Sequence, residues 1–146
     1  MGERRKARGL AVQVLFSLDF GVDSPEEAFD LICKNFDEEK KITSFAKELV
    51  LGVWENIKEI DKAINKASKN WRLERMSRVD KSILRLATYE LLFRDDIPPK
   101  VSINEAVELG KRFGNENSYG FINGILDNIY NSMIMKEEGD KDAKEI

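Results

Sequence analysis

Residues 79–93 read VDKSILRLATYELLF, and this stretch decides the fold. Its apolar side chains lie around almost the whole circumference of a helix, which is typical of a helix enclosed by other helices. We therefore expect a central helix over residues 79–93. Glu90 interrupts the apolar pattern. Because a buried carboxylate needs hydrogen-bond donors or a cationic partner, we expect a structural hydrogen bond or ion pair at Glu90, not catalysis.

The flanking sequence repeats the helical period of about 3.6 residues, and no segment alternates with the period of two that indicates a strand. We therefore predict an all-α protein of about seven helices. Gly21 should end the first helix, and Ser24-Pro25 should begin the second. The run Ser102-Ile103-Asn104-Glu105 predicts a capping box that begins a helix after the extended Pro98-Pro99 connection. The predicted helical segments are 3–20, 25–36, 43–68 with a bend near Gly52, 79–93, 102–114 and 122–133.

The chain length of 146 residues suits one domain. We expect a single domain over 1–135, with an N-terminal half over 1–70 and a C-terminal half over 71–135. Trp71 should anchor the junction between the two halves, within a short turn or helix. Residues 136–146 are charged and lack aromatic side chains, so we expect them to form a disordered acidic tail.

The composition argues against most catalytic classes. The chain has no histidine, and its one cysteine, Cys33, can form neither an intrachain disulfide nor a cysteine-rich metal site. The two glycine-rich motifs that bind nucleotides, G-x-x-x-x-G-K-[ST] and G-x-G-x-x-G, do not occur. No carboxylate pair has a spacing that indicates acid–base catalysis. We expect a binding protein, not an enzyme, without cofactor or metal. Because no secretion signal and no apolar run of about 20 residues occurs, we expect a cytoplasmic protein without a membrane span.

Positive charge is concentrated at the start of the chain. The first ten residues hold four basic side chains and one acidic side chain, whereas the other 136 residues hold 20 basic and 26 acidic side chains. A basic segment on an acidic protein is typical of a site for a polyanion, most often a nucleic acid, although a solvated chain end is the alternative. The segment begins the first predicted helix, which would present its basic residues in a fixed array. These residues are Arg4, Arg5, Lys6 and Arg8.

Phe16 lies on the same side of the predicted first helix as Arg5, opposite the apolar stripe that begins at Ala7. An exposed ring beside guanidinium groups could stack on the unpaired bases of single-stranded RNA. Alternatively, Phe16 could pack on a second element, as apolar residues at helical spacing commonly do. Both interpretations stay open.

Residues 113–121, which read FGNENSYGF, form a second candidate site between the last two helices. Asn115, Asn117 and Ser118 could read base edges, and the three aromatic rings could stack on bases. In the alternative interpretation, Gly114 is a helix C-cap, Ser118 or Asn117 is an N-cap, and the rings are core anchors.

Four stretches of this sequence together resemble the NusB family of transcription antitermination factors. They cover the chain from Arg4 to about Tyr130, and their order and spacing are more specific than any one of them. The stretches are RRKAR with AVQVLF (4–16), VDK with LRLATYEL (79–91), INEAVEL with FG (103–114) and FINGILD (121–127).

This resemblance implies two packed three-helix-type halves and a role without catalysis. Members bind the boxA element of nascent RNA together with the ribosomal protein NusE, and the complex helps RNA polymerase to read through terminators, notably in ribosomal RNA operons. The resemblance implies that NusE docks around Asp80 and Arg85. It implies an RNA surface that includes Arg4, Arg5, Arg8, Phe16, Phe113, Asn117 and Phe121, with Lys6 in the same basic segment.

Two positions depart from the family pattern. Many relatives have a lysine where this chain has Gly120, so one expected phosphate contact is missing here. Many also have an aromatic hydroxyl where this chain has Phe16, so the ring can stack on a base but cannot form that hydrogen bond. The family includes monomers and homodimers, and both states stay open. The rival hypotheses are a helical protein-interaction adaptor without direct RNA binding and a helical domain detached from an RNA-modifying enzyme. The second rival is less consistent with the short acidic segment that ends this chain.

Overall fold

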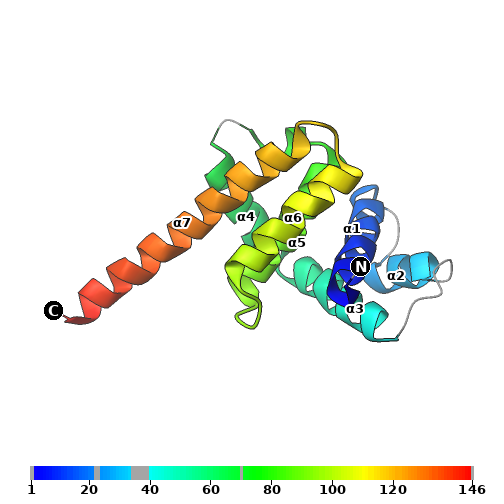
Figure 1. Ribbon diagram of the computed structural model, residues 1–146, viewed down its shortest axis with the longest axis horizontal. Helices are drawn as coiled ribbons and strands as arrows, with labels where there is room; N and C mark the ends of the chain where they lie inside the picture. Colours follow the sequence, from blue (N-terminus) through cyan, green and yellow to red (C-terminus); the bar gives the residue numbers. More distant parts are fainter. Residues whose placement is uncertain (1, 22–23, 34–39, 70, 146) are drawn as a thin grey trace.

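One central helix organises the fold. The computed structural model describes residues 2–21, 24–33, 40–69 and 71–145, and these contain seven α-helices, a short 3₁₀ helix and no strand (Figure 1). The predicted all-α class is therefore confirmed. In chain order the elements are α1 (Glu3–Asp19), α2 (Pro25–Cys33), α3 (Lys40–Glu55), α4 (Ile57–Ser68), η1 (Leu73–Arg75), α5 (Arg78–Phe93), α6 (Pro99–Phe113) and α7 (Ser118–Glu145).

Helix α5 contacts α1, α3, α4, α6 and α7, which explains why its sequence is apolar on nearly every side. Helices α1, α2 and α3 pack on one another, and α7 packs on α4, α5 and α6. In Figure 1 the first group lies at one end of the molecule, and the C-terminal part of α7 extends away from the other helices. Buried apolar side chains from all seven α-helices form one continuous core. No described helix has both the length and the hydropathy needed to cross a membrane.

The predicted boundary between α1 and α2 is confirmed. Gly21 follows α1 with a φ of 77°, a left-handed conformation that glycine adopts without steric cost, and its N–H donates to the carbonyl of Leu18 at 3.0 Å. Ser24 caps α2, because its hydroxyl accepts a hydrogen bond from the N–H of Glu27 at 3.3 Å.

The segment predicted as one bent helix is two helices that meet at Asn56. The Asn56 amide donates to the carbonyl of Gly52 at 2.8 Å, so the side chain competes with the helical backbone at the point where α3 ends. Gly52 has a different role from the expected bend. A Cβ atom at this position would lie 2.1 Å from Cζ of Tyr89, so only glycine allows α3 and α5 to approach this closely.

The predicted capping box at Ser102 is wrong. Helix α6 begins three residues earlier, at Pro99, because proline has a fixed φ suited to the first helical position and lacks the N–H that would be unpaired there. Ser102 lies inside the helix and is buried. Its hydroxyl donates to Oε1 of Glu90 at 2.9 Å, so Ser102 stabilises a buried carboxylate instead of a helix end.

Two further segments differ from their predictions. Trp71 does not anchor the junction between the halves, because it is 55% exposed, whereas Leu73 is buried and its N–H donates to Oδ1 of Asn65 at 2.9 Å. Helix α7 continues through Glu145, although the sequence predicts a disordered tail from residue 136. Lys and Glu, which are frequent in this segment, are good helix formers, so a solvated helix is compatible with its charge.

Candidate nucleic-acid interface

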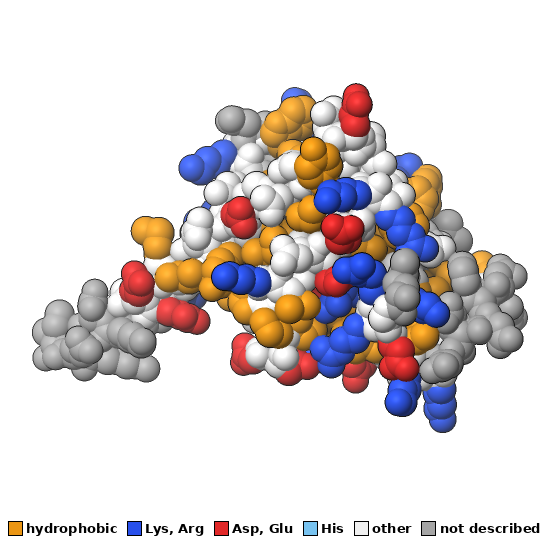
Figure 2. All heavy atoms as spheres, in the orientation of Figure 1, with side chains coloured by type: hydrophobic (Ala, Val, Ile, Leu, Met, Phe, Trp, Pro, Cys, Tyr) orange, Lys and Arg blue, Asp and Glu red, His pale blue; other side chains and the backbone are white. Residues whose placement is uncertain are grey.

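The basic residues at the start of α1 divide into exposed and buried side chains. Arg4, Arg5 and Lys6 are exposed, whereas Arg8 is only 3% exposed. Figure 2 shows Lys and Arg side chains over α1, α3 and α6 with acidic side chains between them. The cationic surface of α1 is therefore smaller than the sequence predicts.

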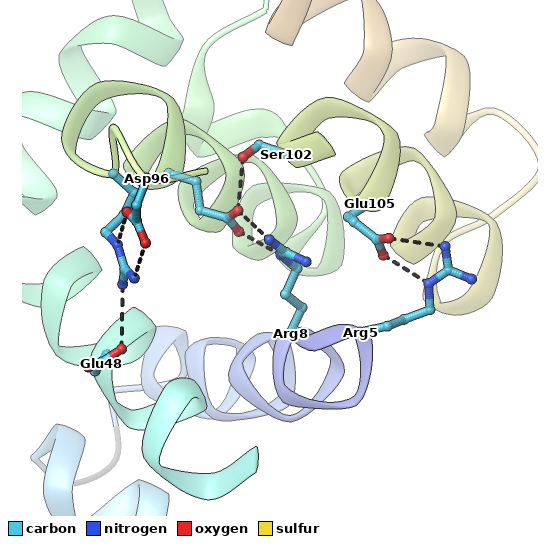
Figure 3. A network of polar contacts seen from close by, with 8 residues as sticks. Arg5, Arg8, Glu48, Asp96, Ser102 and Glu105 are labelled. Atoms are coloured by element: carbon cyan, nitrogen blue, oxygen red, sulfur yellow. Dashed lines mark hydrogen bonds and ion pairs between the residues drawn. The ribbon is translucent and has the colours of Figure 1, made fainter. Parts of the chain in front are cut away.

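Arg8 forms a two-bond ion pair with Glu90 inside the protein (Figure 3). Its Nε atom lies 2.9 Å from Oε2 and its Nη2 atom 2.8 Å from Oε1, while Ser102 donates to the same carboxylate. The expected partner of Glu90 is thus confirmed. The assignment of Arg8 to the RNA surface needs correction, because a guanidinium that compensates a buried carboxylate has no free edge for a phosphate.

Arg5 points along α6 and forms a second two-bond ion pair, with Glu105. Nε and Nη2 of Arg5 lie 2.9 and 3.0 Å from the two carboxylate oxygens, and the pair is solvent-accessible (Figure 3). This contact raises the pKa of Arg5 through the hydrogen bond and the charge of Glu105. The Arg5 side chain is 47% exposed, whereas the Glu105 side chain is only 17% exposed.

Arg4 lies over the ring of Phe45, with its guanidinium carbon 4.6 Å from the ring centroid. Arg94 approaches the same ring at 5.6 Å and is held by Asp96, whose two oxygens each lie 2.9 Å from a guanidinium nitrogen. The hydrogen bond from Arg94 lowers the pKa of Asp96 to about 2. Arg94 is thus neutralised locally, whereas Arg4 remains an exposed cation on a rigid aromatic support.

Phe16 and Phe113 line the same groove. The groove has a volume of about 330 Å³, and its other lining residues are Val12, Gln13, Ile32 and Val79. Phe16 is partly buried and meets Phe20 edge to face, at a centroid distance of 5.0 Å. The packing interpretation of Phe16 is therefore confirmed in part, and the ring also lines an open groove. Stacking of Phe16 on RNA bases stays a prediction.

The glycine in the first helix brings α1 close to the end of α6. A Cβ atom at Gly9 would lie 3.4 Å from Nη1 of Arg112 and 3.9 Å from Cε2 of Phe113. Gly9, which follows the basic residues of α1, therefore lies against Phe113, the first residue of the segment 113–121.

The segment between α6 and α7 is a compact hydrogen-bonded turn. The Ser118 hydroxyl accepts from the N–H of Asn115 at 3.0 Å, and Oδ1 of Asn115 accepts from the N–H of Asn117 at 2.8 Å. Ser118 is buried, whereas Asn115 and Asn117 are exposed. Because Oδ1 of Asn115 accepts a bond within the turn, Asn117 is the exposed amide whose side chain is not used by these bonds.

A second cavity, of about 350 Å³, lies on the other side of this turn. Phe121 meets Trp71 edge to face inside it, with the ring centroids 6.2 Å apart. The sequence did not identify Trp71 and Arg75 as site residues, although exposed aromatic and basic residues side by side are typical of RNA surfaces. The lining residues are Trp71, Arg75, Met76, Ser77, Asp80, Asn115, Asn117 and Phe121.

The two residues predicted to contact a partner protein, Asp80 and Arg85, line different cavities. Asp80 is 8% exposed and belongs to the cavity of Trp71 and Phe121. Arg85 is partly buried and forms a two-bond ion pair with Asp61, at 2.8 and 2.9 Å, while its third nitrogen lies 3.4 Å from Asp19. Arg85 thereby ties α1, α4 and α5 together.

Comparison with known proteins identifies close relatives. A family model described as the NusB family matches residues 5–131. A protein of Desulfatibacillum aliphaticivorans named transcription antitermination protein NusB is 50% identical over 141 residues, which cover 97% of this chain and 99% of the relative. A protein of the same name from Geobacter sulfurreducens is 51% identical over 134 residues, which cover 91% and 97%.

Solved structures agree with this relationship. T. maritima NusB has a TM-score of 0.80 at 42% identity, over 88% of this chain and 90% of that chain. A crystal structure of the antitermination factors NusB and NusE in complex with dsRNA contains a chain with a TM-score of 0.81 at 32% identity, over 89% of this chain and 97% of that chain.

Proposed function

The chain belongs to the NusB family, and we propose that it is a transcription antitermination factor that binds boxA-type RNA together with a NusE-type ribosomal protein. It would act in the cytoplasm, without catalysis, by helping the RNA polymerase elongation complex to read through terminators, notably in ribosomal RNA operons. The names of its relatives support this role, as does the similar chain that is found with NusE and dsRNA.

The observation that carries the proposal is the contact between the basic turn of α1 and the aromatic end of α6. Phe16 and Phe113 line one groove, and Arg4 and Lys6 project into solvent from the same helix as Phe16. Cations hold phosphates and rings stack on bases, so this combination suits an unpaired RNA strand better than a protein partner. Asn117 and Phe121 would extend the surface beyond the turn.

Arg5 would join this surface by exchanging its partner. In the free protein its guanidinium binds Glu105, and an RNA phosphate offers the same two-oxygen geometry. The Arg5 side chain is 47% exposed, so a phosphate can approach its guanidinium from solvent. Arg8 takes no part in RNA contact and instead fixes the angle at which α1 presents the exposed cations.

The NusE-type partner would dock around Arg85, at a small groove lined by residues of α1, α3, α4 and α5. Trp54 lines this groove together with Arg85, Ile57 and Leu18, and it is 43% exposed. Exposed tryptophan beside a fixed arginine is typical of the residues that dominate protein–protein binding. This placement keeps the protein partner and the RNA on separate parts of the surface.

The test is binding of a fluorescein-labelled, single-stranded boxA-like RNA, measured by anisotropy with and without purified NusE-type protein. We expect weak, salt-sensitive binding to the chain alone and tighter binding when the partner is present. Partner binding without any RNA affinity would favour the protein-interaction adaptor. RNA binding that the partner does not improve would contradict the proposal that the two proteins bind the RNA together.

A further inference from the structure

One oxygen of the Asp80 carboxylate is buried without a hydrogen-bond partner. Asp80 is the third residue of α5, where its backbone N–H donates to the Ser77 hydroxyl at 3.1 Å. The residue is 8% exposed, and its Oδ1 atom accepts no hydrogen bond from the protein. Buried carboxylate oxygens are nearly always hydrogen-bonded, so this atom indicates a missing donor.

The missing donor can come from the cavity that Asp80 lines. This cavity, of about 350 Å³, is large enough for one nucleobase, and the edge-to-face rings of Trp71 and Phe121 form its wall. Aromatic walls bind unpaired bases by stacking. The torsion that rotates a carboxylate is soft, so a small rotation of Asp80 presents its oxygens to a base in the cavity.

We propose that this cavity is a guanine-reading subsite, in which the Asp80 carboxylate accepts hydrogen bonds from the Watson–Crick edge of one RNA base. Guanine offers two adjacent donors there, its N1–H and its exocyclic amino group, which match the two oxygens of a carboxylate. Uracil places carbonyl acceptors on both sides of its single N–H and would be repelled. The inference rests on the proposed RNA-binding function and adds base specificity to it.

The charges around the cavity favour a base over a protein side chain. A partner arginine or lysine could also pair with Asp80, but Arg75 lines the cavity and the adjoining Arg72 is exposed. These cations would repel a cationic side chain, whereas they would attract the phosphates that flank a base. Asn117 lies at the same cavity and is exposed, so its amide can complete the polar edge.

The test compares two 12-nucleotide single-stranded RNAs that differ at one position. One carries a single guanosine in a uridine strand, and the other carries inosine there, which lacks the exocyclic amino group. We expect the intact chain to bind the guanosine strand about tenfold more tightly, the value of one hydrogen bond to a charged group. Asp80→Asn should remove most of this preference, because an amide has one acceptor oxygen in place of two, so in either orientation its NH2 group faces one of the two guanine donors and the charge is lost.

Asp95→Asn is the matched control. Asp95 is an exposed residue just beyond the other end of α5, and the change removes the same charge. Both variants should bind polyanions slightly better, but only Asp80→Asn should lose the guanosine preference. Circular dichroism confirms that each variant is folded.

Each other outcome overturns the inference in a recognisable way. Salt-sensitive binding with equal affinity for the two strands removes the guanine subsite and leaves the proposed function intact. No affinity for either strand, with or without the NusE-type protein, removes the proposed function as well. A preference that survives Asp80→Asn places the base elsewhere, and a variant that loses only the NusE-type partner assigns Asp80 to the protein interface.

Discussion

Arg8 of the first helix and Glu90 of the central helix form a two-bond ion pair in the protein core, with contacts of 2.9 and 2.8 Å. The pair joins helices that are 82 residues apart in sequence, and Ser102 of α6 adds a third bond to the same carboxylate. Its role is to set the orientation of α1, so that the neighbouring Arg4 and Lys6 project from the surface at a fixed angle.

Replacing Arg8 by alanine should therefore reduce the free energy of unfolding strongly. Glu90 would remain as an uncompensated buried charge, and such losses cost about 3–5 kcal/mol. Chemical denaturation followed by circular dichroism measures the change. Arg4→Ala is the control, because removing an exposed side chain should change stability by less than about 0.5 kcal/mol. Equal effects of the two changes would show that Arg8 is not the buried partner of Glu90.

Gly52→Ala should destabilise the contact between α3 and α5. The new methyl group would lie 2.1 Å from Cζ of Tyr89, which is itself stacked on Phe93. We expect overpacking to cost about 1–3 kcal/mol in thermal or chemical unfolding. Gly124→Ala offers the opposite control, because a Cβ there meets no atom within 4 Å and alanine favours the helix by about 0.5–1 kcal/mol. A neutral Gly52→Ala would contradict the close approach.

Asp96 should titrate at an acidic pH. The hydrogen bond from Arg94 lowers its pKa from 3.8 to about 2, so the pair stabilises the fold above pH 3.8, and this contribution is lost as the pH falls through about 2. NMR titration of the carboxyl carbon measures this value directly. In Arg94→Gln the pKa of Asp96 should rise toward 3.8, the value from which the Arg94 hydrogen bond lowers it. An unchanged low pKa in that variant would mean that another group stabilises the carboxylate.

Trp54→Ala should lower the affinity of the chain for the NusE-type partner by about tenfold or more, as expected for an exposed tryptophan at the centre of an interface. Isothermal titration calorimetry with the purified partner gives the affinity. Trp71→Ala removes the other exposed tryptophan and should leave this affinity unchanged, since Trp71 lines the cavity proposed for RNA. If both changes have the same effect, the partner does not dock at the groove of Arg85.

The helices themselves could be predicted from the sequence, because their apolar periodicity and end residues are local features. The central helix, the end of α1 at Gly21 and the start of α2 after Ser24 are examples. The start of α6 was missed, because Pro99 and Ser102 both offer a helix start and the sequence does not show that the Ser102 hydroxyl is needed by Glu90.

The site was predicted less completely, because exposure depends on tertiary packing. Arg8 looked like its basic neighbours, yet it precedes the buried Val12 and Leu15 by four and seven residues, a spacing that places it on an inward face. Together with the buried carboxylate expected at Glu90, this spacing could have identified the pair. The exposure of Trp71 and its contact with Phe121 depend on residues 50 positions apart and leave no local trace.

The central claim is that the exposed cations on the first turns of α1 hold RNA phosphates beside the aromatic groove. The most direct measurement is the salt dependence of RNA affinity for Arg4→Ala/Lys6→Ala, compared with Lys58→Ala/Lys62→Ala, which removes two exposed charges from α4. The first variant should bind more weakly, with a slope of log affinity against log salt that falls by about one for each lost phosphate contact, while the second should match the unaltered chain. Equal slopes for all three proteins would contradict the claim.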